Sequence, residues 1–173
     1  ALYHQIKLNE TNKTNSVHIV NNGGKTLFVR IYREGIPLVG DTTNAENGLE
    51  LNVKYLNLAG EKLDPSKIKQ GIDFTARVTL KNTGLINDYK EMALTQIFPS
   101  GWEIRNARMD QGYKQSNMFN YQDIRDDRVL TYFDLKKGET KTFDIKINAT
   151  YRGAFYLPTV YCEAMYNQQI NAR

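Results

Sequence analysis

The chain has 173 residues, of which 40% are hydrophobic and 24% are charged, and its formal net charge is +4. These values suit one folded soluble domain, or one domain with a piece of another, and no apolar run reaches the roughly 18 residues of a membrane-spanning helix, so we expect no direct membrane insertion. Lysine and arginine alternate with acidic residues, and Lys136-Lys137 is the one adjacent basic pair, which argues against nucleic acid as a partner.

The first forty residues read as part of a β domain. The chain opens at Ala1 without Met and enters a strand-like run at once, and its start lacks the charged and apolar regions of a signal peptide. We expect strands at 2–8, 16–21 and 25–33, with a tight hairpin turn over Asn22-Gly23-Gly24-Lys25. Three strands are too few for an independent core, so residues 1–40 are interpreted as the C-terminal strands of an incomplete domain.

A small, polar and flexible stretch follows at residues 38–48 and predicts a linker, placed at 41–47 in the domain division. The remaining residues, 48–173, suffice for a complete β-sandwich. The strands expected there span 48–57, 72–82, 90–98, 102–108, 129–135, 140–149 and 154–166.

Two-residue alternation is the signal behind these strands. Phe74, Ala76, Val78 and Leu80 would share one face of a strand, and the polar residues between them the other. The run 142–149 repeats the pattern. Turns are expected at 57–60 and 136–139, and a loop or single helical turn from Asp64 to near Gly71. The sequence therefore predicts an all-β, antiparallel sandwich of the immunoglobulin-like or macroglobulin-like kind.

The segment 109–128 shows no regular alternation and predicts either a long loop or a short helix. It ends in an acidic cluster in which arginines are interleaved. Three interpretations stay open for this cluster: a salt-bridged loop, a calcium site and a charged patch that faces a partner. The residues concerned are Asp123, Arg125, Asp126, Asp127 and Arg128.

Trp102 is the single tryptophan and follows Pro99 and Gly101, which predict the end of one strand and a sharp bend. It is either a core or corner aromatic, or a surface anchor for a partner. Trp102, Asp123, Arg125, Asp126, Asp127 and Arg128 are therefore the candidate interaction residues.

Catalytic chemistry finds little support in the sequence. Serine-hydrolase, zinc-protease and phosphate-loop motifs are absent, and the two histidines, His4 and His18, both lie in the partial N-terminal segment. Cys162 is the single cysteine and sits within a strand-like run, as a small buried hydrophobic residue does. We therefore expect no enzyme activity, no cofactor and no metal site.

Three segments resemble the last domain of bacterial alpha-2-macroglobulins. They are Phe98–Asn106 (Phe-Pro-Ser-Gly-Trp-Glu-Ile-Arg-Asn), Asp123–Val129 with its Arg-Asp-Asp-Arg run, and the closing stretch from Gly153 through Glu163-Ala164-Met165-Tyr166 to Ala172-Arg173. Gly35-Ile36-Pro37 and Asn47-Gly48-Leu49 extend the likeness more loosely to the whole chain.

The resemblance implies the end of a CUB-like domain followed by a macroglobulin-like sandwich. Proteins of this family are large, periplasmic or surface-located and often lipoproteins, and they are thought to trap proteases that cut a bait region. The implied function is a non-catalytic structural and interaction module, whose partners are other domains of the parent chain and trapped proteases. The alternative is a sandwich that binds a receptor or a cell-wall enzyme. The family's thioester motif is not in this chain, because Cys162 lacks that context, so no reactive residue is carried over.

Overall fold

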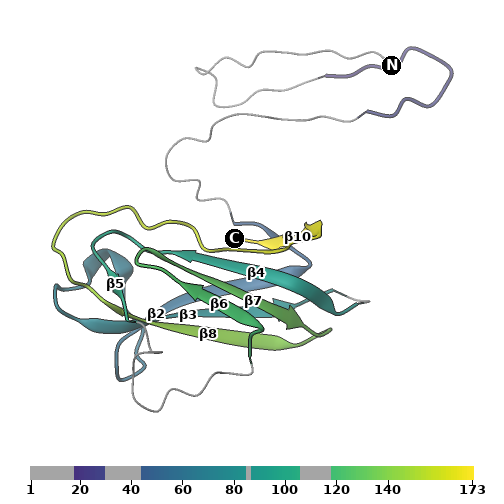
Figure 1. The fold of residues 1–173 in the computed structure, drawn as a ribbon. Helices are drawn as coiled ribbons and strands as arrows, with labels where there is room; N and C mark the ends of the chain where they lie inside the picture. Colours follow the sequence, from purple (N-terminus) through teal and green to yellow (C-terminus); the bar gives the residue numbers. More distant parts are fainter. Residues whose placement is uncertain (1–17, 30–43, 85–86, 106–117) are drawn as a thin grey trace. The chain divides into compact units, whose positions relative to one another are not determined.

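The computed structural model describes residues 18–29, 44–84, 87–105 and 118–173 (Figure 1). The chain divides into two compact units, 1–36 and 37–173. In the first unit, Asn21 closes a bend over residues 23–25: its Oδ1 accepts from the Gly23 N–H at 3.0 Å and its Nδ2 donates to the Lys25 carbonyl at 2.8 Å. The strands expected at 16–21 and 25–33 are not formed over residues 18–21 and 25–29, whose side chains are all exposed. The strand expected at 2–8 lies outside the described residues.

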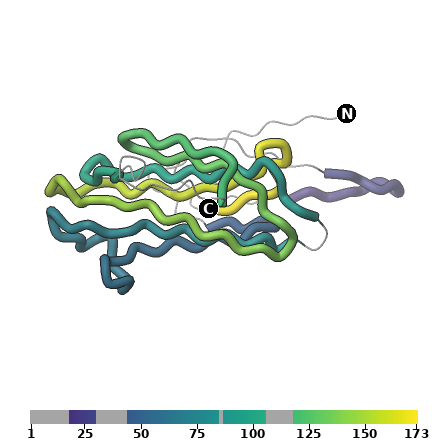
Figure 2. Tube along the Cα trace, turned by 60° about the horizontal axis from the view of Figure 1, so that its bottom comes forward, coloured from purple at the N-terminus to yellow at the C-terminus, as the bar shows by residue number. Residues whose placement is uncertain are grey.

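The second unit is a sandwich of two antiparallel sheets (Figures 1 and 2). The four-stranded sheet has the order β2-β3-β8-β5, and the six-stranded sheet has the order β1-β10-β9-β4-β7-β6. The strands are β1 (Glu46–Asn47), β2 (Leu49–Leu56), β3 (Asp73–Asn82), β4 (Tyr89–Ile97), β5 (Glu103–Ile104), β6 (Tyr121–Ile124), β7 (Arg128–Leu135), β8 (Thr140–Asn148), β9 (Tyr161–Ala164) and β10 (Asn167–Ala172). A 3-10 helix, η1 (Pro65–Lys67), follows the N-cap Asp64.

The alternation in the sequence decides which side of each strand is buried. In β3, Phe74, Ala76, Val78 and Leu80 are almost fully buried, and the polar residues between them face outward. Val78 lies opposite Val53 of β2 and Phe143 of β8, so the inward faces of three strands coincide. Because a pleated strand turns successive side chains to opposite sides, these registers build one apolar layer. The predicted antiparallel sandwich is confirmed.

Two adjoining clusters form the core between the sheets. One contains Phe133 and Phe143, whose ring centroids lie 4.8 Å apart. The other contains Phe74, with Tyr55 and Trp102 packed against it at centroid distances of 6.3 and 4.9 Å. Burial of aromatic side chains of this size makes both clusters large contributors to stability, and the second cluster adds edge-to-face contacts.

The turns follow the predicted chemistry. Gly60 and Gly138 adopt φ of 85° and 70°, which glycine reaches without steric cost, and the Gly60 N–H donates to the Asn57 carbonyl at 2.9 Å. Between Asp64 and Gly71, η1 supplies the single helical turn, and the Asp64 carboxylate accepts from the Ser66 N–H at 2.9 Å.

Several elements differ from the sequence prediction. The single strand expected at 154–166 is instead an irregular stretch, β9 and a turn at Met165-Tyr166, and β10 follows at residues where no strand was expected. β6 forms within the segment expected to be a loop or helix. It is a strand because it pairs with β7, with Tyr121 opposite Tyr132. The expected strand at 102–108 is short: β5 covers two residues, and 106–108 lie outside the described residues.

The linker expected at 38–48 is described from residue 44 onward. Ala45 exchanges two backbone hydrogen bonds with Arg173, and Glu46 and Asn47 pair with Ala172 and Asn171. This end of the linker is therefore an edge strand of the six-stranded sheet, while 38–43 lie outside the described residues. Over the residues that the structure describes, no helix is long and apolar enough to cross a membrane.

Candidate interaction face

The register of four neighbouring strands assembles one outward surface on the six-stranded sheet. Tyr121, Tyr132, Ala93 and Glu163 lie side by side across β6, β7, β4 and β9. The next row consists of Asp123, Leu130, Thr95 and Tyr161, and Ile97 lies opposite Arg128 beyond it. We call these ten residues the outer face.

Apolar and aromatic side chains occupy the centre of the outer face, on β7 and β4, and extend to Tyr121 on the edge strand β6. The Tyr121 and Tyr132 rings stack with centroids 6.0 Å apart and planes at 29°, although the Tyr121 side chain remains 59% exposed. Leu130 and Ile97 are half-buried. Among the described residues, no helix or strand covers these side chains. Half-exposed aromatic and aliphatic side chains on the outward side of a sheet are suited to contact with another protein surface.

Tyr161 and Glu163 border this centre on β9. The Tyr161 hydroxyl donates to the Glu163 carboxylate at 2.9 Å. Burial, reinforced by this hydrogen bond, raises the pKa of Tyr161 above its ordinary value. The tyrosine is therefore neutral at physiological pH and presents its ring to the outer face, while its hydroxyl orients the carboxylate.

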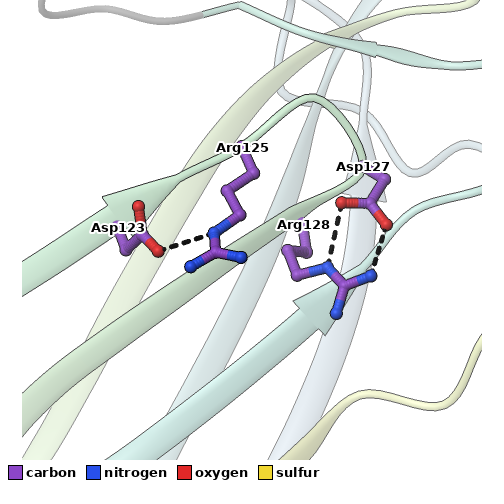
Figure 3. Close-up of polar contacts among 4 residues, drawn as sticks. All are labelled: Asp123, Arg125, Asp127 and Arg128. Atoms are coloured by element: carbon purple, nitrogen blue, oxygen red, sulfur yellow. Dashed lines mark hydrogen bonds and ion pairs between the residues drawn. The ribbon is translucent and has the colours of Figure 1, made fainter.

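The turn between β6 and β7 holds most of the charged candidates (Figure 3). The Arg125 Nε donates to Asp123 at 2.8 Å, and Arg128 makes a two-pronged contact with Asp127 at 2.9 and 2.6 Å. Bidentate arginine–carboxylate contacts are geometrically specific. The Arg128 hydrogen bond is the main reason that the pKa of Asp127 lies below its usual value.

Backbone hydrogen bonds hold the same turn. The Arg125 N–H donates to the Arg128 carbonyl, and the Phe98 N–H donates to the Asp127 carbonyl, both at 2.9 Å. Asp126 is exposed at the tip of the turn. The carboxylates of Asp123 and Asp127 are each engaged by an arginine, and no group of three or more potential metal ligands occurs within the described part of the chain. The geometry is that of a salt-bridged turn.

Trp102 lies apart from the outer face. Its ring packs edge-on against Phe74 and Tyr55, with centroids 4.9 and 5.6 Å away. The backbone N–H of Trp102 donates to the Pro99 carbonyl at 2.9 Å and closes the turn. It is half-buried at the margin of the core. The structure thus brings Asp123 and Arg128 onto the outer face, places Arg125, Asp126 and Asp127 in the adjoining turn, and assigns Trp102 a packing position.

Cys162 lies directly beneath the outer face and is fully buried, as the sequence predicted. Burial is the main reason that the pKa of its thiol lies far above the ordinary value, and the nearby Glu163 adds to it. The thiol is therefore protonated and shielded from solvent. The outer face above it can thus act through surface contact and not through this thiol.

Sequence reasoning missed the centre of the outer face. The signal was present in 128–135, where Leu130 and Tyr132 are apolar although they alternate with the buried Val129 and Phe133. A strand that is apolar on both sides is either buried on both sides or carries a contact surface on one. Tyr121 gave no comparable signal, because its position depends on pairing with Tyr132.

The fold and this face can be compared with known proteins. The model of the bacterial alpha-2-macroglobulin MG10 domain matches residues 48–169, which is more than half of the chain. The chain belongs to this family. The match spans β2 to β9 and the first half of β10, so it includes the whole four-stranded sheet, most of the six-stranded sheet and every residue of the outer face.

Relatives and solved structures agree with this assignment. The chain is 26% identical over 157 residues to an alpha-2-macroglobulin of Pasteurella multocida, covering 90% of this chain and 8% of the relative, and 29% identical over 136 residues to one of Rickettsia conorii, covering 74% and 7%. It therefore spans less than a tenth of the length of either relative.

The fold is similar to parts of two solved alpha-2-macroglobulins. One is a Salmonella alpha-2-macroglobulin reacted with methylamine, with a TM-score of 0.66, 20% identity and coverage of 78% of this chain and 9% of that one. The other is native Escherichia coli alpha-2-macroglobulin from domain MG7 to the C-terminus, with a TM-score of 0.67, 18% identity and coverage of 78% and 23%. The domain is thus a structural module of a bacterial alpha-2-macroglobulin-like protein.

Proposed function

We propose that this chain is a non-catalytic structural and interaction module of a protease-trapping protein, and that its outer face docks against another domain of the parent chain. The observation that carries the proposal is the MG10 family match over residues 48–169. One solved relative with this fold is an Escherichia coli alpha-2-macroglobulin activated by porcine elastase. By analogy, the parent of this chain would trap proteases and change its domain contacts when it is cut.

The outer face supports the docking role by its chemistry. Its centre is apolar and aromatic at Tyr132, on which Tyr121 of the edge strand stacks. Its margin carries Asp123 and Arg128, each of which forms an ion pair with a residue of the adjoining turn. An apolar centre with a polar margin is the usual arrangement of a protein interface. Because the relatives are more than ten times longer than this chain, other domains of the parent are the surfaces available to it.

The proposed domain division assigns residues 1–40 to the end of a CUB-like domain, 41–47 to a linker and 48–173 to the macroglobulin-like sandwich. A boundary between compact units at residues 36 and 37, and a family match that begins at residue 48, support it. Limited proteolysis of the chain should then cut first between residues 36 and 45 and release a resistant sandwich. Cleavage first inside the sandwich would argue against this division.

The location of the parent is proposed to be the periplasm or the cell surface. Proteases that reach the cell from outside enter these compartments first, so a protease-trapping protein would act there. The cell-wall enzyme considered as an alternative partner gains no support from any surface described above. Fractionation of the producing cells, with the parent followed by an antibody, tests the location, and a cytoplasmic parent would contradict it.

Site-directed photocrosslinking in the intact parent protein tests the docking role. A photoreactive phenylalanine analogue at Tyr132 reports on the outer face, and the same analogue at Thr79 reports on the outward side of the other sheet as a matched control. Crosslinks from position 132 to another domain, which change after the parent is cut by a protease, are expected. No crosslink from position 132 in either state, or equal crosslinking from both positions, would overturn the docking assignment.

A further inference from the structure

The sequence contains two asparagine–glycine pairs, Asn22-Gly23 and Asn47-Gly48. This pair is prone to spontaneous deamidation, because glycine has no side chain that keeps its own backbone nitrogen away from the asparagine amide. The nitrogen reaches that amide only when the asparagine backbone leaves the extended conformation of a paired strand. The two pairs are alike in sequence, so their structural settings decide which of them can react.

Asn22 lies at the start of the exposed bend of the first unit, where the backbone belongs to neither a helix nor a strand. Within the described residues, no hydrogen bond engages its side chain. The Gly23 N–H donates to the Asn21 Oδ1 at 3.0 Å, and this acceptor is an exposed side chain that a single rotation removes. A Cβ atom added at Gly24 would meet nothing within 4 Å, so the chain has room to turn.

Asn47 is held on both sides of the reacting bond. It pairs with Asn171 of β10 as part of β1, and its Nδ2 donates to the Asn171 Oδ1 at 3.0 Å. The following Gly48 has a φ of 67°, and its carbonyl accepts from the Tyr89 hydroxyl at 2.9 Å and from the Thr83 N–H at 3.2 Å. Ring closure at Asn47 therefore requires β1 to leave the sheet locally.

We propose that Asn22 is a site of spontaneous deamidation in the native protein, and that the sandwich protects Asn47 from the same reaction. The Gly23 nitrogen bonds to the Asn22 Cγ, the Cγ–Nδ2 bond breaks, and ammonia leaves with the proton that the Gly23 nitrogen loses. Water then opens the resulting succinimide ring at either carbonyl and leaves an aspartate or an isoaspartate. Each conversion adds one negative charge, so the formal net charge falls from +4 to +3. The proposal does not depend on the role of the outer face.

Peptide mapping by mass spectrometry tests the proposal on the native parent protein, incubated in mildly alkaline buffer and sampled over time. Trypsin releases residues 14–25 and 34–54 as separate peptides, so the two asparagine–glycine pairs are followed independently. Fragmentation of each peptide assigns the conversion to Asn22 or Asn47. Asn22 should convert at least roughly tenfold faster, a ratio that corresponds to about 1.4 kcal/mol for the local opening of β1.

Unfolding and substitution provide the controls. In concentrated urea the two asparagines should convert at similar rates, because β1 no longer holds Asn47. Gly23→Val should slow conversion at Asn22 several-fold, since the branched side chain shields the attacking nitrogen. Gly23 does not adopt positive φ, and a Cβ there meets only the Asn21 Oδ1 at 3.4 Å, so the bend accommodates valine. Equal rates at Asn22 and Asn47 in the native protein, or an unchanged ratio in urea, would overturn the proposal.

Discussion

The ring of Phe155 lies directly against the backbone of Gly101. A Cβ atom added at Gly101 would approach the Phe155 Cζ to 2.8 Å, and a Cβ added at Gly153 would approach the same atom to 2.8 Å. The Tyr151 N–H also donates to the Gly101 carbonyl at 3.0 Å. The two glycines thus leave room for the Phe155 ring, which belongs to the irregular stretch before β9.

Gly101→Ala is expected to lower the free energy of unfolding by about 1–3 kcal/mol, because the new methyl group overpacks the Phe155 ring. Chemical denaturation measures the change. In a Phe155→Ala background the same substitution should cost much less, since the ring is gone. An equal cost in both backgrounds would mean that Phe155 does not determine the need for glycine at this position.

Gln96→Met is expected to raise the free energy of unfolding by about 1 kcal/mol. Gln96 is fully buried, and among the described residues neither its Nε2 nor its Oε1 has a hydrogen-bond partner, so an apolar side chain of similar volume removes a desolvation cost. Gln122→Met is the matched control. The Gln122 Nε2 donates to the buried Thr131 hydroxyl at 3.0 Å, so that substitution should destabilise the domain. If both variants are less stable, Gln96 has a polar partner, such as a buried water.

Glu91→Val is expected to destabilise the domain by about 1–2 kcal/mol, because a β-branched residue is poorly accommodated at positive φ. Glu91 adopts φ of 54° at the bulge in β4, where its N–H donates to Asp134 at 3.0 Å. Thermal unfolding measures the loss. Lys90→Val, at the exposed neighbouring position, should have little effect, and Glu91→Gly should be tolerated. A large loss from Glu91→Gly would show that the glutamate side chain, and not the backbone, is required.

Stability should decline as the pH rises above about 9. Burial raises the pKa of Cys162 above its ordinary value of 9.0 and that of Tyr55 from 10.0 to about 12. Both groups stay protonated in the fold and ionise in the unfolded chain, so stability is complete below the unfolded pKa and is lost up to the folded one. Each group contributes about 1.4 kcal/mol per pH unit within its window.

Denaturant titrations between pH 7 and 11 measure this slope. Cys162→Ala should flatten the decline that begins near pH 9, while the decline from Tyr55 above pH 10 remains. The same buried thiol should not react with an aromatic disulfide reagent until the protein unfolds. Rapid reaction of the folded chain at neutral pH would contradict the burial on which this prediction depends.

The sequence predicted the architecture well where burial is regular. Alternation in 72–82 and 140–149 led to β3 and β8 within a residue at each end, because an inward face of four apolar side chains leaves one strand register possible. It missed β10, and it also missed β1 and β6, which have two and four residues and too little alternation to detect. Their existence depends on partners that are distant in the chain, namely β10 and β7.

The candidate residues show the same difference between features that depend on neighbouring residues and features that depend on distant ones. The pairing of Asp127 with Arg128 could be anticipated from adjacency, whereas the position of Trp102 between Tyr55 and Phe74 required the packing of three separate segments. The outer face was invisible for a related reason. It draws on β4, β6, β7 and β9, and only their mutual register turns scattered residues into one surface.

The sequence by itself determined that this chain would stack antiparallel sheets, because the alternation of apolar and polar side chains is a local property that can be recognised within a short stretch of residues. Only the tertiary structure decided which strands meet, and therefore that Tyr121 stacks on Tyr132 and that β2 ends a sheet. Strand order is set by the total burial of many distant side chains, and no short window of sequence contains that sum.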